Sequence, residues 1–156
     1  MKRALAPLAL ALAAFAPGLA AAKGPFGLGL AIGDPTGVNG KYKLGQSTAV
    51  DGTVGLSLVN GNRLSTHLDF HWVRPLQGIV SWYVGLGGKL VAYDRDHDKH
   101  GHDDDGIWMG ARAPLGLDLE FRGVPLDLFI EIAAVLWVVE RVDLDLDGAI
   151  GVRYWF

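Results

Sequence analysis

The last seven residues, 150–156, read Ile-Gly-Val-Arg-Tyr-Trp-Phe and constrain the fold more than any other stretch. β-Branched and aromatic side chains stand at every second position, which is the pattern of a β-strand with one apolar face. The apolar face of this strand includes the final residue, Phe156. If this strand is typical of the chain, alternating strands of about ten residues should fill most of the remaining sequence.

Turn-forming stretches divide residues 23–156 into eight alternating segments. Gly, Pro and Asn, the residues that adopt turn dihedral angles, concentrate in these stretches. They are residues 33–37, 45–48, 60–62, 74–78, 94–106, 122–125 and, less sharply, 140–143. A period of two recurs in every segment, most weakly over residues 38–44, and no helical period replaces it. The sequence therefore predicts an all-β fold.

The two faces of the segments differ strongly in composition. In residues 64–72, for example, Leu68 and Phe70 alternate with His67 and Asp69. A soluble barrel would bury the aliphatic face, whereas a membrane barrel turns that face to lipid. The aliphatic face is nearly unbroken, and the opposite face combines charges with glycines, which would leave room for long charged side chains in a narrow lumen. This favours an eight-stranded antiparallel up-and-down transmembrane β-barrel.

Aromatic residues near the segment ends support the membrane version. Membrane barrels carry aromatic girdles where their strands meet the two interfaces. The residues expected there are Phe26, Trp72, Trp82, Tyr93, Trp108, Phe121, Tyr154 and Phe156.

The N-terminus has the features of a secretory signal. Lys2 and Arg3 precede an apolar stretch over residues 4–19, and alanines follow at positions 20–22. This arrangement predicts a cleaved signal peptide over residues 1–22 and a single barrel domain over residues 23–156. Cleavage removes two positive charges from a chain whose net charge is already −3, which argues against nucleic-acid binding. The absence of cysteine agrees with export without a disulfide framework.

Several stretches together carry a family resemblance. They are Gly-Asp-Pro-Thr-Gly at 33–37, Ala-Arg-Ala-Pro-Leu-Gly-Leu at 111–117, Pro-Leu-Asp-Leu-Phe-Ile-Glu at 125–131 and the final strand. The chain resembles the small eight-stranded outer-membrane barrels of Gram-negative bacteria, with OmpA/OmpX-like architecture and short loops. The resemblance implies a monomer in contact with outer-membrane lipid and lipopolysaccharide, with both termini in the periplasm. It also implies insertion by the barrel-assembly machinery, which would read Val152, Tyr154 and Phe156.

Charged residues on the inward face define a candidate network. The positive set is Lys41, Lys43, Lys89, Arg112 and Arg153, and the negative set is Asp51, Asp69, Asp118, Glu120 and Glu131. The lumen of an eight-stranded barrel is just wide enough for side chains, so unpaired charges would be costly there. We expect a salt-bridge network that plugs the barrel. The alternative is a gated minor pore in which a pair such as Arg112 and Glu131 switches partners.

Residues 94–105 form an acidic, histidine-rich loop. Its candidate metal ligands are His97, Asp98, His100, His102 and Asp103. Imidazole and carboxylate groups suit Zn²⁺, Ni²⁺ or Cu²⁺, although the spacing matches neither a structural zinc site nor an EF-hand. Three interpretations stay open: a solvated loop, weak adventitious metal binding, and a dedicated metal site. No other cofactor is expected.

Three functions remain possible for such a barrel. A structural or surface-interaction role in the outer membrane is favoured. A soluble periplasmic barrel that binds a small ligand is the alternative, and a lipid-modifying outer-membrane enzyme is the third. Ser65, His67 and Asp69 do not form a catalytic triad by spacing, because positions i and i+2 of a strand lie about 6.5–7 Å apart. We therefore expect no enzymatic activity.

Overall fold

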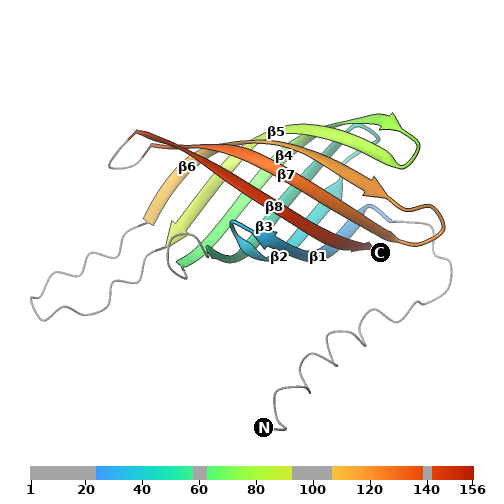
Figure 1. Ribbon diagram of the computed structural model, residues 1–156, viewed down its shortest axis with the longest axis horizontal. Helices are drawn as coiled ribbons and strands as arrows, with labels where there is room; N and C mark the ends of the chain where they lie inside the picture. The colour runs from blue at the N-terminus through green and yellow to red at the C-terminus, as the bar shows by residue number, and fades with distance from the viewer. Residues whose placement is uncertain (1–23, 58–62, 93–106, 139–141) are drawn as a thin grey trace, which may run out of the picture.

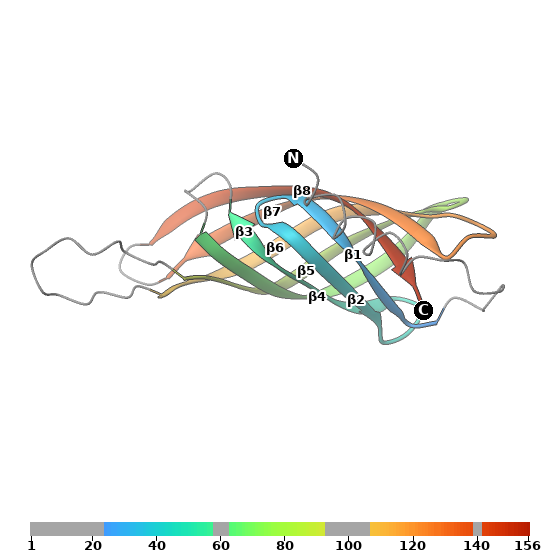
Figure 2. The same ribbon diagram turned by 90° about the horizontal axis from the view of Figure 1, so that it is seen from below.

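A computed structural model describes residues 24–57, 63–92, 107–138 and 142–156. Its strands are β1 (Phe26–Gly33), β2 (Thr36–Lys43), β3 (Thr48–Ser57), β4 (Arg63–Gln77), β5 (Val80–Ala92), β6 (Ile107–Glu120), β7 (Leu126–Trp137) and β8 (Asp143–Trp155). Each strand pairs antiparallel with the next, and β1 pairs with β8 to close the barrel (Figures 1 and 2). The predicted eight-stranded up-and-down barrel is confirmed. None of the described residues belongs to a helix of membrane-spanning length and hydrophobicity.

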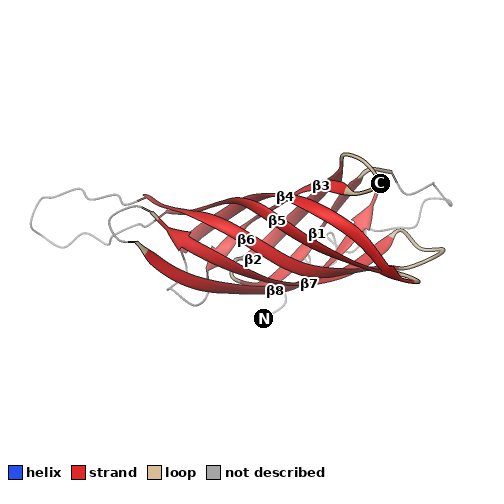
Figure 3. Cartoon of the chain, turned by 90° about the horizontal axis from the view of Figure 1, so that it is seen from above, coloured by secondary structure: helices blue, strands red, loops and turns tan. Residues whose placement is uncertain are grey.

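The pairing register fixes which side chains face the lumen. Along β7, Asp127, Phe129 and Glu131 are buried, whereas Leu128 and Ile130 between them are exposed. A similar alternation runs through β1, β5 and β6, whose places in the barrel wall are shown in Figure 3. The outer wall is therefore aliphatic and the interior polar, which is the orientation of a membrane barrel and the reverse of a soluble one.

The two ends of the barrel are built differently. Gly27 of β1 pairs with Trp155 of β8, so the described chain starts and finishes at one end, here called the terminal end. At the opposite, distal end, β1 stops at Gly33, which pairs with Ala149. Residues 143–147 of β8 continue beyond β1 and pair, among the described residues, only with β7. Figure 2 shows the β7–β8 pair extending past the short β1–β2 hairpin.

The turn after β4 lies later than the sequence predicts. The stretch 74–78 marks a turn, yet β4 continues to Gln77 and the chain reverses at Gly78, whose φ is 64°. Proline is tolerated at position 75 because the pairing of β3 with β4 ends at Trp72. Beyond that point one side of β4 is a free edge, where a missing backbone N–H costs nothing. In the same stretch, the pairing of β4 with β5 shifts register between Pro75 and Gln77.

The other predicted turns have two outcomes. The chain reverses at residues 34–35, 44–47 and 121–125, at or next to the stretches predicted from Gly, Pro and Asn. The turns predicted at residues 60–62 and 94–106 lie outside the described residues, as does the first half, residues 140–141, of the turn predicted at 140–143. The same holds for the predicted signal peptide over residues 1–22.

Several glycines on the inner wall accommodate aromatic rings. A Cβ atom added to Gly27 would lie 3.1 Å from the indole ring of Trp155. A Cβ on Gly116 would overlap the phenol of Tyr83. Small residues on one strand therefore provide the space that a ring from the neighbouring strand fills.

An aromatic cluster closes part of the lumen at the distal end. Val91, Val135 and Trp137 are buried together, and Trp108 packs against them with its ring centroid 6.0 Å from that of Trp137. The prediction that Trp108 belongs to an outer girdle is therefore wrong. Its position has the inward parity of Arg112 on the same strand, so its ring turns toward the lumen.

Candidate functional site

The predicted charge network lies inside the barrel. Eight of its residues are buried: Lys41, Asp51, Asp69, Lys89, Arg112, Asp118, Glu131 and Arg153. Glu120 is half-buried near the terminal end, where it accepts a 2.7 Å hydrogen bond from Lys43 Nζ. Every strand from β2 to β8 contributes at least one of these side chains. The network therefore joins almost the whole circumference of the barrel.

Three further carboxylates, which the predicted network omits, are buried with it. Asp127 lies on the same inward parity of β7 as Glu131, and Asp147 lies on that of Arg153 in β8, so strand alternation could have identified both. Asp34 lies in the turn between β1 and β2, where no alternation applies. The sequence therefore carries a signal for two of the three, and none for Asp34.

The lumen is acidic, and the predicted balance of five against five is wrong. Below the distal rim, the lumenal carboxylates of the described residues are Asp34, Asp51, Asp69, Asp118, Glu120, Asp127, Glu131 and Asp147. The Lys and Arg side chains beside them are Lys41, Lys43, Lys89, Arg112 and Arg153. At the rim itself one cation and two carboxylates share the inward parity: Arg63, Asp143 and Asp145. Acidic groups therefore outnumber these cations in the part of the lumen that the structure describes.

Arg153 is the centre of the network toward the terminal end. Its Nη1 donates to Asp51 at 2.7 Å, its Nε donates to Asp127 at 3.0 Å, and its Nη2 donates to Asp118. The guanidinium carbon also lies 4.2 Å from the ring centroid of Phe129. A planar guanidinium with five donors suits this task, because it can hold three carboxylates from three strands at once.

Two lysines extend this network. Lys41 pairs with Asp118, and its Nζ lies 4.4 Å from the ring centroid of Tyr83. Lys43, which pairs with Glu120, lies over the indole of Trp155 at 4.2 Å. Each ammonium group thus meets a carboxylate and an aromatic face, and both kinds of contact stabilise a cation that has lost water.

Arg112 is the second centre and lies nearer the distal end. Its Nη1 donates to Asp69 and its Nη2 donates to Glu131 at 2.5 Å. Its Nε makes no hydrogen bond but lies 3.6 Å from a carboxylate oxygen of Asp147. Asp147 in turn accepts hydrogen bonds of 2.7 and 2.8 Å from Lys89. Arg112 therefore holds two carboxylates firmly and has a third within reach.

Two buried histidines flank the Arg112 centre. His71 stacks on Tyr83 with centroids 4.3 Å apart, and its Nε2 lies 3.9 Å from Glu131, which accepts a 2.7 Å hydrogen bond from the Tyr83 hydroxyl. His67 Nε2 lies 3.8 Å from Asp69. Both distances exceed that of a hydrogen bond. The structure gives no hydrogen-bond partner to either nitrogen of His71, to His67 Nδ1 or to Asp69 Oδ1.

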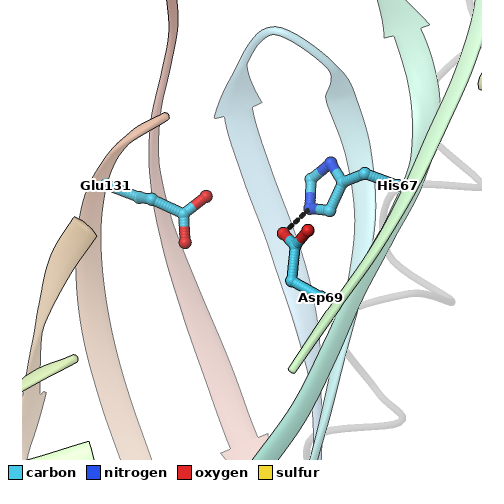
Figure 4. A group of neighbouring side chains, drawn as sticks. All are labelled: His67, Asp69 and Glu131. Atoms are coloured by element: carbon cyan, nitrogen blue, oxygen red, sulfur yellow. Dashed lines mark ion pairs between the residues drawn. The ribbon is translucent and has the colours of Figure 1, made fainter. Parts of the chain in front are cut away.

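His67, Asp69 and Glu131 form a candidate metal-ligating group. One ligand atom from each lies within 4.8 Å of the others, and all three residues are buried. Figure 4 shows Glu131 on β7 pointing across the lumen toward His67 and Asp69 on β4. One imidazole and two carboxylates are a suitable donor set for a divalent transition metal. The sequence identifies these residues only separately, because the contact between β4 and β7 depends on barrel closure.

The triad interpretation gains no support from this arrangement. The side chains of His67 and Asp69 approach more closely than backbone spacing suggests, but they do not hydrogen bond. Ser65 Oγ has no hydrogen-bond partner. A nucleophile activated by a base requires a hydrogen bond between the two, so Ser65 is not an activated nucleophile here.

The remaining predicted residues divide between the outer wall and the part of the chain that is not described. Val152 is exposed on the outer face of β8, and Tyr154 lies on the same face. Phe156, directly after the strand, is exposed and stacks on Phe26 with centroids 6.2 Å apart. The candidate loop ligands lie outside the described residues, and that metal site stays a prediction: His97, Asp98, His100, His102 and Asp103.

Comparison with known proteins supports the fold. No known protein family matches the sequence, and no curated protein matches it either. A solved structure, the N-terminal β-barrel domain of Pseudomonas aeruginosa OprF, is similar with a TM-score of 0.66 and 13% sequence identity. The alignment covers 84% of this chain and 95% of that domain. The chain therefore has the architecture of the small eight-stranded outer-membrane β-barrels that its sequence resembles.

Proposed function

We propose that this chain is an exported bacterial outer-membrane barrel whose plugged lumen gives it a structural or surface-interaction role. The observation that carries the proposal is the orientation of its two faces. Aliphatic side chains such as Leu68, which is 64% exposed, cover the outer wall, while Arg112 and Arg153 are buried inside. Such a wall is compatible with lipid and would be a large apolar surface in water. In this proposal the terminal end faces the periplasm.

The ion pairs support the proposal that the lumen is plugged. Arg153 on β8 holds Asp51 on β3 and Asp118 on β6, so its contacts cross the barrel instead of following one wall. Arg112 on β6 reaches Asp69 on β4 in the same way. An ion could pass only if these contacts opened, and breaking a buried pair by removing one partner costs several kcal/mol.

Membrane location is tested by fractionation and heat-modifiability. The protein should be found in the sarkosyl-insoluble outer-membrane fraction, and its gel mobility should change when the sample is boiled in detergent. A folded barrel keeps its hydrogen-bonded wall in detergent until it is heated, which is the physical reason for the shift. Recovery as a soluble periplasmic protein without a shift would contradict the proposal and favour the small-ligand alternative.

A gated minor pore is the second candidate function. It is favoured by Arg112, whose Nε lies near Asp147 without a hydrogen bond and could exchange partners there. Planar bilayers containing the purified barrel should then show small and rare conductance steps. Arg112→Gln should make the steps more frequent, because it removes the side chain that links Asp69 to Glu131. A protein titration without steps for either form would contradict this candidate.

We infer no enzymatic role for the barrel. The supporting observation is that Ser65, His67 and Asp69 lack a hydrogen bond between nucleophile and base. Lipid A from cells with and without the gene should give identical mass spectra. A mass difference that depends on the gene would support the third interpretation, a lipid-modifying enzyme. Contact with lipopolysaccharide, insertion by the barrel-assembly machinery and a monomeric state complete the proposal.

A further inference from the structure

We propose that the lumen holds a divalent transition-metal site formed by His67, Asp69 and Glu131, which the ion occupies in competition with Arg112. Zinc is the reference ion, because it accepts imidazole nitrogen and carboxylate oxygen together. The site lies inside the barrel and includes none of residues 94–105.

The geometry is close to that of a metal centre. Zinc lies about 2.0–2.2 Å from nitrogen and oxygen ligands, so two ligands of one ion are at most roughly 4.4 Å apart. The ligand atoms of His67, Asp69 and Glu131 lie within 4.8 Å of one another. Small side-chain rotations are therefore enough to bring all three onto one ion. The three residues come from two strands fixed by the barrel, which limits the cost of ordering them.

Several buried polar atoms around this site have no hydrogen-bond partner among the described residues. Asp69 is 1% exposed, yet its Oδ1 has no hydrogen bond, and His67 Nε2 lies 3.8 Å from the Asp69 carboxylate without donating to it. Both nitrogens of the fully buried His71 are also unpartnered, with Nε2 directed at Glu131 from 3.9 Å. Buried polar groups normally have partners. A bound cation would give His67 and Asp69 theirs, and His71 lies close enough to Glu131 to act as a further donor.

The charge of the lumen favours an added dication. The lumenal carboxylates outnumber the Lys and Arg side chains among the described residues. Arg112 now bridges Asp69 and Glu131, so an entering ion must compete with its guanidinium. Arg112 has another acceptor within reach, since its Nε lies 3.6 Å from Asp147. The ion can therefore take the two carboxylates while Arg112 remains paired.

A row of aspartates gives the ion a route from the distal end. Asp143, Asp145 and Asp147 occupy alternate positions of β8 on its inward face, and the first two are exposed. Neighbours on one strand face lie about 6.5–7 Å apart, so the row leads stepwise into the lumen. Clefts with an excess of one sign of charge concentrate ions of the opposite sign, and at this rim Asp143 and Asp145 outnumber Arg63. Asp147, the buried end of the row, lies beside Arg112.

Zinc titration of the mature barrel in detergent tests the proposal. The protein should carry His97→Ala, His100→Ala and His102→Ala, so that the histidine-rich loop does not contribute. Calorimetry should then show one zinc ion per chain with micromolar or tighter affinity. His67→Gln and Glu131→Gln should each weaken binding at least tenfold, whereas Arg112→Gln should strengthen it at least tenfold. Lys41→Gln is the matched control, because it also removes a buried cation but one that pairs with Asp118 outside the site.

Weaker zinc binding by His67→Gln and Glu131→Gln, together with tighter binding by Arg112→Gln, distinguishes this site from nonspecific binding. Every variant is first checked for heat-modifiability, so that only folded barrels are compared. If Arg112→Gln does not fold, the two ligand variants and the absorption spectrum of the Co²⁺-loaded barrel decide, since loss of an imidazole ligand changes that spectrum. No zinc binding, or equal affinity of the barrel with and without His67→Gln, would overturn the proposal. The outer-membrane proposal does not depend on this result.

Discussion

A buried ion pair in this barrel affects stability mainly because losing one partner leaves the other charge buried and unpaired. Arg153 is 1% exposed and faces three carboxylates, which leave water together with it. The mutual attraction offsets much of the desolvation cost of all four groups. Removing the guanidinium leaves three acidic groups near one another without their common partner, so the structural effect should exceed that of any surface pair.

We predict that Arg153→Met lowers the free energy of unfolding by about 3–5 kcal/mol, the range for breaking a buried ion pair. The matched control is Arg122→Met, because Arg122 is exposed and donates a long hydrogen bond of 3.4 Å to the Gly78 carbonyl. Urea unfolding in lipid vesicles, followed by tryptophan fluorescence, measures both variants. Equal stability of the two would show that the Arg153 network does not hold the barrel together.

The sequence predicts which face of the barrel a side chain occupies better than which side chains it contacts. Period-two alternation alone places Arg153 and Asp118 on the inner face, where both are buried. It does not indicate that they touch, because β6 and β8 meet only across the closed lumen. Asp34 could not be predicted at all, since a turn residue has no strand parity.

Neighbouring strands fit together through glycines that face aromatic rings. Gly116 on β6 lies against Tyr83 on β5, and these two residues are register partners. Gly151 on β8 lies in the same way against Phe129 on β7. This complementarity links adjacent strands by shape and adds to their backbone hydrogen bonds.

We predict that Gly116→Val destabilises the barrel by about 1–3 kcal/mol, because the new side chain overlaps the Tyr83 phenol and overpacking has costs of this size. In a Tyr83→Ala background, Gly116→Val should cost less than it does in the native barrel, because the overlapping ring is gone. Gly40→Val is the control, since a Cβ there meets only ordinary contacts at 3.9–4.0 Å. A double-mutant cycle on unfolding free energies checks the coupling, and strictly additive effects would contradict it.

Turn-forming residues alone could not predict where the strands end. Pro75 marks a turn in the sequence, but β4 continues past it and stays paired with β5. The proline is tolerated because β3 no longer pairs with β4 at this position. Whether proline ends a strand depends on whether its edge is covered, and that is a property of the neighbouring strand. In contrast, Gly33 and Gly123 lie at predicted turns and have the positive φ angles that favour glycine.

The whole molecule presents Phe156 on its membrane-facing side. Phe156 is exposed, stacks on Phe26, and donates its backbone N–H to the Phe26 carbonyl at 2.9 Å. These few contacts suggest a small contribution to stability. The proposed role of Phe156 in recognition by the assembly machinery is therefore separable from its role in the folded barrel.

We predict that Phe156→Ser lowers the amount of heat-modifiable protein in the outer membrane severalfold, while refolding into detergent in vitro is nearly unchanged. Phe26→Ser is the control, because it removes one of the two ring contacts of Phe156, the other being with Tyr154, and leaves Phe156 intact. Quantitative immunoblots of membrane fractions measure assembly. Equal losses for the two variants would assign Phe156 to packing and not to recognition.

The pairing of β1 with β8 joins the first and last strands of the chain, and this has a consequence for the order of folding. Hairpins such as β4–β5 form from local contacts, but the last seam requires the most distant strands to meet. Until it forms, the sheet has two free edges, which favour aggregation. Unclosed chains must therefore be kept from associating with one another until β8 pairs with β1. Closure of this seam removes both free edges and with them the main route to aggregation.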